Sequence, residues 1–344
     1  MSRKTLLGMT PGELKEVAKE CGLPSFAAKQ LSEWLYKKKV ASIDDMTNIS
    51  KAGREKLKEN YDLGLIYPLE KHVSVDGTKK YLFPYNETRF TEAVMIPDGD
   101  RYTLCVSSQA GCRNACRFCM TGRQGFGGNM TVAEILSQYY TIDEADQLTN
   151  TVFMGMGEPL DNPENVFRAI EVLTADWGFG WSPKRITLSS IGVLPNLERF
   201  LDNTKAHLAI SLHNPFADER RALMPIQGRY ALDDVIALIK KYDFTGQRRV
   251  SFEYTMFDGV NDTKRHADAL AAMLKGLECR VNLIRFHQIP DSPLRPTPRP
   301  VIELFKNRLC DEGITATVRA SRGEDIMAAC GMLAGKASEK AGNK

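Results

Sequence analysis

The stretch Gly111-Cys-Arg-Asn-Ala-Cys-Arg-Phe-Cys119 places three cysteines at C-x3-C-x2-C spacing, directly after a β-like run from Tyr102 to Ser108. Iron–sulfur clusters are held by cysteine thiolates, and Cys112, Cys116 and Cys119 can hold three irons of a four-iron cubane. The fourth iron is then left for an outside ligand, which the amino and carboxylate groups of S-adenosylmethionine (SAM) can supply. The spacing therefore predicts one [4Fe-4S] cluster per chain, with SAM beside it.

A zinc site is the alternative interpretation of these cysteines. Structural zinc prefers four closed ligands, usually in two separated pairs. No second pair of Cys or His lies nearby in the sequence. The spacing favours the cluster over zinc, and over three cysteines that are merely buried together.

The composition is that of a globular enzyme with one large and one small domain. The chain has 344 residues, 43% of them hydrophobic and 26% charged, which excludes the disordered class. The eight cysteines are too unevenly spaced for a disulfide framework, and the chain shows neither a signal peptide nor an apolar run that suggests a membrane helix. We therefore expect a cytoplasmic protein with no membrane partner. The net charge of +3 neither favours nor excludes RNA.

The sequence pattern divides the chain into a helical amino-terminal domain, a β-meander, a catalytic core and a mobile polar tail, over residues 1–65, 66–100, 101–335 and 336–344. Helix starts are expected at Thr10, Ser25 and Ile43. The dipeptide Asp76-Gly77 predicts a hairpin turn within the meander.

The run Lys37-Lys38-Lys39, beside Trp34 and Tyr36, is a candidate contact for an RNA backbone. Basic residues interleaved with aromatics are a common nucleic-acid footprint. A solvated helix end with its aromatic rings in the core explains the same residues equally well. The pattern alone leaves both interpretations open.

Strands and helices alternate from Tyr102 onward. Strands are expected near residues 102–108, 150–156, 185–191, 207–213, 250–256 and 280–286, with a last strand at 315–320. Helices are expected near residues 131–145, 162–176, 194–203, 231–245, 263–277 and 299–312. Six βα units in succession predict an α/β fold whose parallel sheet curves into a partial (βα)6 barrel. Chemistry in such barrels takes place at the carboxyl ends of the strands.

Candidate cofactor contacts lie at or near those ends. A glycine lets the backbone approach a ligand closely, and a neighbouring glutamate can accept hydrogen bonds from the SAM ammonium. Short polar groups can hold ribose, carboxylate or adenine, although they also cap helices and satisfy turns, and a histidine there can equally be a satisfied core residue. The predicted SAM contacts are Gly157, Glu158, Ser189, Ser211, Leu212, His213 and Asn282.

Different short motifs are distributed along nearly the whole chain. They are Thr103-Leu-Cys105 running to Gln109, Met154-Gly-Met-Gly-Glu-Pro159, Leu212-His213, Met224-Pro-Ile226, Gly259-Val-Asn-Asp262, Val281-Asn-Leu-Ile284 and Asp325-Ile-Met-Ala-Ala-Cys330-Gly331. Together with the cysteine spacing, these motifs resemble the RlmN/Cfr family of radical-SAM RNA adenine methyltransferases. The resemblance implies a partial-barrel core, a helical RNA-binding accessory domain and an RNA substrate.

The resemblance further implies a two-stage reaction that uses two SAM molecules per turnover. One SAM methylates a cysteine, and a second gives a 5′-deoxyadenosyl radical. Matched to the family's motifs, Cys330 is the methyl-carrying cysteine, and Cys105 is the cysteine that resolves the protein–RNA adduct as a disulfide. Glu92 matches the position assigned as proton acceptor, a role that Cys105 could also fill.

Adenine chemistry explains why two further cysteines are needed. Carbon 2 of adenine is electron-poor and unsuited to polar attack on a methyl sulfonium, whereas a methylene radical on sulfur can add to it. The carbon–sulfur bond must then break, and a second thiolate can attack the carrier sulfur to leave a disulfide. An outside electron donor such as a flavodoxin system is implied, and we expect a monomer.

Family members methylate either carbon 2 or carbon 8 of one ribosomal adenine. The stretch Thr121-Gly-Arg-Gln-Gly-Phe126 is closer to the carbon-2 enzymes. The resemblance thus implies carbon 2 of adenine 2503 in 23S rRNA, and adenine 37 in tRNAs, with carbon 8 as the alternative. One departure is that Gly127-Gly128 stand where these enzymes usually carry Asn-Arg, which puts a phosphate contact of that loop in doubt.

Two other classes of function remain open. A non-catalytic RNA-binding protein with a structural metal or iron–sulfur site would need Cys112, Cys116 and Cys119 for folding, but neither Cys105 nor Cys330. A radical-SAM enzyme acting on a small molecule would leave the amino-terminal domain without a role.

Overall fold

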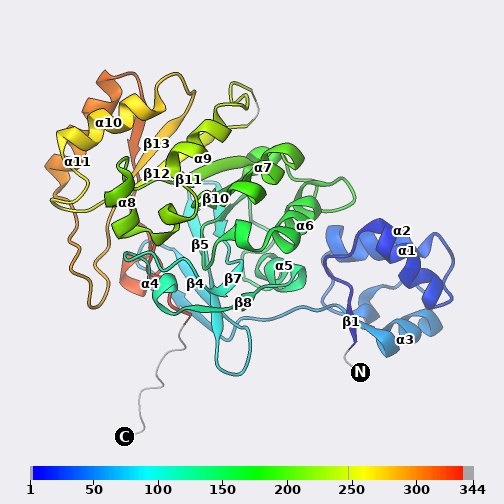
Figure 1. The fold of residues 1–344 in the computed structure, drawn as a ribbon. Coiled ribbons are helices and arrows are strands. Elements are labelled where there is room, and N and C mark those ends of the chain that lie inside the picture. The colour runs from blue at the N-terminus through cyan, green and yellow to red at the C-terminus, as the bar shows by residue number, and fades with distance from the viewer. Residues whose placement is uncertain (1–2, 247, 336–344) are drawn as a thin grey trace, which may run out of the picture. The chain divides into compact units, whose positions relative to one another are not determined.

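The chain forms two compact units in a computed structural model that describes residues 3–246 and 248–335 (Figure 1). The first unit takes the chain up to Pro68 together with Met130–Gln147 and Glu164–Ser182. The second takes Leu69–Asn129, Leu148–Pro163 and the described chain from residue 183. The polar tail expected at 336–344 lies outside the described residues. No described helix has both the length and the apolar character needed to cross a membrane.

The first unit is helical, as the amino-terminal sequence predicts. Its helices are α1 (Pro11–Glu20), α2 (Ala27–Ser32), α3 (Lys51–Asn60), α5 (Val132–Tyr140) and α6 (Pro163–Thr174). Only the first residue of α6 is assigned to the second unit. A π-helical turn at Glu33–Lys37 continues α2, and the two-residue strands β1 (Lys4–Thr5) and β2 (Tyr61–Asp62) pair in parallel. Helix α1 begins as expected, because Thr10 and Glu13 each accept a hydrogen bond from the other's backbone N–H.

The third helix does not begin at Ile43, which is a correction to the sequence prediction. Ile43 opens only a 3₁₀ turn, Ile43–Asp45, and α3 starts at Lys51 behind the N-cap Ser50. Helix α3 is highly charged and buries only Gly53 and Leu57. It therefore lacks the apolar spacing by which a helix is recognised in sequence.

Helices α5 and α6 belong to the first unit, although the sequence pattern assigns them to the core segment. Arg168 of α6 pairs with Glu13 of α1 at 2.6 Å, and the Tyr140 hydroxyl of α5 donates to the Leu35 carbonyl at 2.7 Å. Such contacts join segments that are about 100 residues or more apart in the chain, and no local pattern encodes them.

The second unit is built on a ten-stranded sheet in the order β14-β13-β12-β11-β10-β9-β6-β5-β4-β3. From β6 to β14 the strands are parallel and follow one another in chain order: β6 (Arg101–Cys105), β9 (Asn150–Phe153), β10 (Ile186–Ser190), β11 (His207–Ser211), β12 (Val250–Met256), β13 (Arg280–Arg285) and β14 (Thr315–Val318). This order confirms the predicted succession of βα units.

The helices of the second unit lie between these strands in the chain. They are α7 (Leu194–Asn203), α8 (Ala217–Leu223), α9 (Leu232–Ile239), α10 (Lys264–Leu274) and α11 (Arg299–Asp311). The cysteine loop after β6 contains the short helix α4 (Met120–Arg123) between the paired strands β7 (Gln109–Gly111) and β8 (Phe126–Asn129). The sequence did not predict these three elements, because each is too short to show a period.

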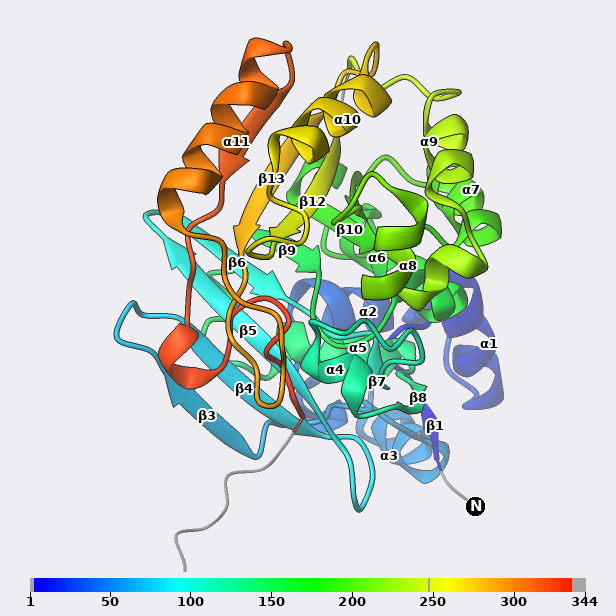
Figure 2. The same ribbon diagram turned by 60° about the vertical axis from the view of Figure 1, so that its left-hand side comes forward.

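Three antiparallel strands extend the sheet beyond β6, as the predicted meander requires. They are β3 (Glu70–Val73), β4 (Lys79–Pro84) and β5 (Phe90–Asp98). Gly77 adopts φ +82° in the turn between β3 and β4, which a glycine tolerates without strain. Figure 2 shows the carboxyl-terminal segment, in red, running beside these strands.

Side chains of alternate residues on the parallel strands face one cavity of about 870 Å³. Ser211, Glu253, Asn282 and Thr317 stand in one row across β11 to β14 because each is the register partner of the next. The last three line the cavity. The sheet thus presents a polar row to an enclosed space.

Candidate active site

The cysteine loop is pinned at its base by the β7–β8 hairpin. The Cys112 N–H donates to the Gly125 carbonyl at 3.1 Å. Gly111 has φ +77°, and a Cβ added there would overlap the Gly125 carbonyl oxygen. Only glycine fits this approach, so the residue before the first cysteine fixes where the loop begins.

The three loop thiols lie close enough to influence one another. Burial raises the pKa of the Cys112 thiol to about 11, and Cys119 raises it further. Burial also raises the pKa of Cys116 well above its usual value, with contributions from Cys119 and Cys112. Asn114 donates to the Cys112 sulfur at 3.5 Å. Thiols become thiolates when a cation ligates them, and three half-buried thiols stand together in this loop, so this donor set fits an iron–sulfur cluster.

No group of three or more His, Cys, Asp or Glu side chains in residues 3–246 and 248–335 is arranged to hold a metal ion. In a four-iron cubane each cysteine thiolate binds a different iron, so the ligating sulfurs need not converge on one point.

A rigid aromatic platform supports the loop. The Phe118 ring packs edge-on against His213, with 4.8 Å between ring centroids. His213 is buried with φ +57°, and its Nδ1 accepts a hydrogen bond from the Thr255 N–H at 2.9 Å. Burial lowers the pKa of His213 to about 3, so the ring is neutral and its Nε2–H remains a donor. Asn261 fixes this turn by donating to the His213 carbonyl at 2.6 Å.

Glu158 is a buried carboxylate that ties two strand ends together. Its Oε1 accepts from the Leu160 N–H and its Oε2 from the Ile191 N–H, both at 3.0 Å. Burial raises the pKa of Glu158 to about 7. An ammonium group placed beside it would favour the carboxylate again. Gly157, with φ +95°, lies so close to Gln109 that a side chain would clash.

The structure brings several of the predicted SAM contacts together. Ser211 and Asn282 lie on either side of Glu253 in the strand register, and Asn282 donates to Glu253 at 2.8 Å. Ser189 is half-buried on β10, on the same side as Thr187 of the cavity wall. Leu212 is fully buried, and its carbonyl accepts from Arg220 at 3.0 Å, so its side chain serves the core while its backbone shapes the turn.

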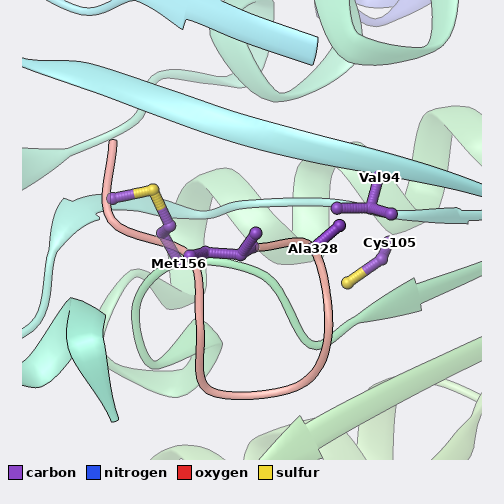
Figure 3. Close-up of a cluster of buried hydrophobic side chains, with 5 residues drawn as sticks. Val94, Cys105, Met156 and Ala328 are labelled. Atoms are coloured by element: carbon purple, nitrogen blue, oxygen red, sulfur yellow. The ribbon is translucent and has the colours of Figure 1, made fainter. Parts of the chain in front are cut away.

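Cys105 and Cys330 lie within electrostatic range of one another. Cys105 belongs to a buried cluster with Val94, Met156 and Ala328, and Figure 3 shows its sulfur directed toward the carboxyl-terminal segment. Burial raises the pKa of Cys105 to about 12, with the Cys330 thiol as the next contribution. Cys330 is solvent-exposed as a residue, yet protein atoms surround its thiol, and this desolvation raises its pKa.

Neighbouring groups have opposite effects on the pKa values of these two thiols. Arg319 lowers the pKa of both Cys105 and Cys330, whereas Glu253 and Cys119 raise that of Cys330. Cys119, Cys330 and Cys105 thus form a sequence of neighbours within electrostatic range, from the cysteine loop to the end of β6.

Glu92 of β5 does not lie free beside these thiols. Its Oε2 accepts from the backbone N–H groups of Ala334 and Gly335, at 2.7 and 2.9 Å, and its Oε1 lies 3.1 Å from Lys80 Nζ. The carboxylate is therefore already engaged on both oxygens.

The cavity is basic at the amino-terminal ends of the strands. Arg101, Arg249 and Arg280 line it there, and Arg319 and Arg322 line it from the segment after β14. The acidic side chains of its lining are Asp98, Glu253 and Glu278. The excess of arginine gives the cavity a field that favours an anionic ligand.

Sequence reasoning missed four charged residues of the site. Arg220 is fully buried and donates to Leu212, Ser211, Ile191 and Gln227. It reads as surface because its helix begins Ala-Asp-Glu-Arg-Arg. The sequence could have indicated Glu253 and Arg319, since each is a charged residue on or at the end of a core strand, where an unpaired charge is costly. No sequence pattern could have indicated Lys80, because its pairing with Glu92 depends on the register of the hairpin.

The departure at Gly127-Gly128 has a structural reason. Cβ atoms there would meet Arg89 and Tyr85, respectively. The Arg89 guanidinium thus packs against the strand from which the family's usual arginine is missing. A basic group remains at this hairpin, contributed by another segment.

Two regions of the chain match family models: the radical SAM superfamily over residues 106–271 and the ribosomal RNA large subunit methyltransferase N-terminal domain over residues 4–63. Probable dual-specificity RNA methyltransferases RlmN from Porphyromonas gingivalis W83 and Bacteroides fragilis ATCC 25285 are 56% and 53% identical, covering 98% and 100% of this chain and 99% and 100% of their own. The chain belongs to the RlmN family of radical-SAM RNA methyltransferases. The crystal structure of a radical SAM methyltransferase from Sphaerobacter thermophilus matches 97% of this chain and 100% of its own, with 37% identity and a TM-score of 0.91.

Membership of the RlmN family establishes a radical-SAM enzyme that methylates RNA and uses a four-iron cluster and SAM. The fold prediction is confirmed by this membership and by the matching crystal structure. The zinc and small-molecule alternatives fall away, as does the non-catalytic RNA-binding protein. The roles of individual residues stay predictions.

Replacing Cys112, Cys116 or Cys119 with Ala should abolish the cluster, because two thiolates hold a cubane poorly. Iron and sulfide analysis after anaerobic reconstitution measures this, with exposed Cys310→Ala as the matched control that keeps its iron. Stoichiometric iron in any of the three variants would contradict the assignment.

Proposed function

We propose that this chain methylates carbon 2 of an adenine in 23S rRNA, and of an adenine in tRNAs, with Cys330 as methyl carrier and Cys105 as resolving thiol. It acts in the cytoplasm as a monomer with a flavodoxin-type electron donor. The observation that supports the proposal is that the Cys330 thiol lies within electrostatic range both of the Cys105 thiol and of Cys119 in the cysteine loop. The relatives' designation as dual-specificity RNA methyltransferases supports two RNA substrates.

The cluster and SAM would supply the one-electron chemistry when bound, two SAM being used in each turnover. Cys112, Cys116 and Cys119 would hold the cluster. Glu158 would receive the SAM ammonium, with Gly157, Ser189, Ser211, Leu212, His213 and Asn282 as further contacts. Burial of Glu158 strengthens its attraction for a cation.

Cys105 has two tasks in this scheme, and its surroundings suit both. Burial keeps it a protonated thiol at neutral pH, so it does not react prematurely. Arg319 favours the thiolate, which attacks the Cys330 sulfur. The S–S bond of the Cys105–Cys330 disulfide forms, the bond from the Cys330 sulfur to the methylene carbon breaks, and this carbon takes a proton from solvent to give the methylated base. The outside donor then returns two electrons to the disulfide. The engaged carboxylate of Glu92 favours Cys105 as the group that takes the adenine proton as well.

The base would reach the thiols through the basic cavity. Its volume of about 870 Å³ has room for a nucleotide, and its arginines would attract the phosphates beside the base. Met154 and Val152 of its wall pack against the cluster that contains Cys105. One wall of the basic cavity therefore adjoins the hydrophobic cluster that contains Cys105.

Transfer of a deuterated methyl group tests the function. The reaction contains reconstituted protein, methyl-labelled SAM, a flavodoxin system and 23S rRNA from a strain lacking the gene. The RNA is then digested, and its nucleosides are separated and identified by mass spectrometry. We expect labelled 2-methyladenosine, and the same product from tRNA. Labelled 8-methyladenosine instead would overturn the carbon-2 assignment.

We expect Lys37 and Lys38 to contact RNA and Lys39 to stabilise the fold. Lys37 and Lys38 are exposed, whereas Lys39 donates to the Ala145 carbonyl at 3.1 Å and lies 4.9 Å from the centre of the Phe179 ring. Lys37→Ala with Lys38→Ala should flatten the salt dependence of RNA binding by about one unit of slope per lost phosphate contact. An unchanged slope would make both lysines solvated surface.

Lys39→Ala should instead destabilise the fold, by about 1 kcal/mol, because the half-buried Ala145 carbonyl loses its donor. Denaturant unfolding measures this. Lys37→Ala is the matched control, in which the free energy of unfolding should not change.

A further inference from the structure

Glu92 holds the carboxyl-terminal segment from within the sheet. Its side chain is 2% exposed, and its carboxylate binds the N–H groups of Ala334 and Gly335. Lys80 of the neighbouring strand balances its charge at 3.1 Å. Such charge-assisted bonds to backbone amides are about twice as strong as neutral ones.

The same segment is fixed at its other end and in its middle. Gly323 N–H donates to Asp76 at 2.9 Å, and Asp325 accepts from Ser74 at 2.5 Å, both on the β3–β4 turn. Directly after Cys119, Met120 N–H donates to the Gly331 carbonyl and the Thr121 hydroxyl to the Leu333 carbonyl, each at 2.8 Å. Cys330 thus stands between two anchored stretches of chain.

Next to Cys330 itself the segment offers only small side chains. Around Cys330 the chain is Ala328-Ala-Cys-Gly331, and small side chains bury little apolar surface. The larger apolar side chains Met332 and Leu333 are buried after it, and Leu333 packs in the cluster that contains Cys105. The hydrogen bonds to backbone groups of residues 331–335 therefore act together with this packing to place the Cys330 thiol.

We propose that Glu92 is a positioning residue: with Lys80 and Thr121 it clamps residues 333–335 and so sets the place of the Cys330 thiol. The inference rests on the proposed role of Cys330 as methyl carrier. Because that thiol must meet first a methyl donor, then a base and finally Cys105, a displacement of about 1 Å can cost about 10²-fold in rate.

The clamp explains Glu92 better than proton transfer does. A carboxylate has about four acceptor positions, and three of them are taken by Ala334, Gly335 and Lys80. A general base needs a position within hydrogen-bond reach of its proton. Glu92 has little left to offer one.

The test compares Glu92→Ala with Glu92→Gln in the reconstituted holoenzyme. The amide oxygen of glutamine can still accept from both N–H groups, whereas alanine leaves them without a partner. In Glu92→Ala we expect faster hydrogen exchange in peptides covering 328–335 and about 10²-fold slower Cys330 methylation. Glu92→Gln should keep most of both, and the exposed Glu87→Ala on the β4–β5 turn is the matched control.

Wild-type exchange and wild-type Cys330 methylation in Glu92→Ala would overturn the clamp, and the accumulation of an RNA adduct in both Glu92 variants would then favour the proton-acceptor role. If Glu92→Ala does not fold, Thr121→Val removes another arm of the clamp, and unchanged exchange there would overturn it. The exchange measurement needs no RNA and no methylation. A failed clamp is thus distinguishable from a failed proposal for the function.

Discussion

Cys105→Ala protein will accumulate RNA joined covalently to Cys330. The variant keeps the cluster cysteines and the methyl carrier, so methylation of Cys330 and addition to adenine can proceed. It lacks the thiol that we propose attacks the Cys330 sulfur. Each chain should therefore stop after one addition, and multiple turnover should disappear.

The adduct is measured as a band that survives denaturant and shifts to the mass of the protein on nuclease digestion. Cys310→Ala is the control, since this exposed cysteine on α11 lies outside the site. The double variant Cys105→Ala/Cys330→Ala should give no band, which locates the bond on Cys330. Normal RNA methylation by Cys105→Ala without any adduct would end the resolving role.

The sequence predicted the sheet of the second unit well, and the reason is periodicity. The strands from β9 to β14 alternate with long amphipathic helices, and this pattern extends over many residues. Elements of three or four residues, such as β7 and β8 around the cysteine loop, carry no period. Their pairing includes a close backbone contact between Gly111 and the Gly125 carbonyl, which the missing side chain of Gly111 permits.

The predictions for the cysteines rest on spacing and motif, which the sequence contains. The electrostatic surroundings of these cysteines were not predictable. Arg220 sits in a helix that begins Ala-Asp-Glu-Arg-Arg, which reads as solvated surface, yet it is fully buried and bonded to four partners. Lys80 and Glu92 look like ordinary alternating residues of a hairpin. Tertiary contacts give these residues their roles, and local sequence does not contain such contacts.

Cys330→Ala should abolish methylation of both the protein and the RNA, while the iron–sulfur cluster and SAM binding are retained. Cys330→Ala removes one sulfur atom from a residue that is exposed as a whole and whose neighbours Ala329 and Gly331 are small, so the backbone of the segment should keep its place. The anchors of its segment are backbone bonds at Gly331 and Leu333, which the substitution does not touch. Iron content and SAM affinity should therefore match those of the unaltered chain.

Without the Cys330 sulfur no atom receives the first methyl group, so neither methylated protein at this site nor methylated RNA can form. Peptide mass spectrometry after incubation with methyl-labelled SAM measures the first, and nucleoside analysis the second. RNA methylation at the rate of the unaltered chain would exclude Cys330 as carrier. Labelled protein at another cysteine would move that role, with Cys105 as the first candidate because its thiol lies within electrostatic range of residue 330.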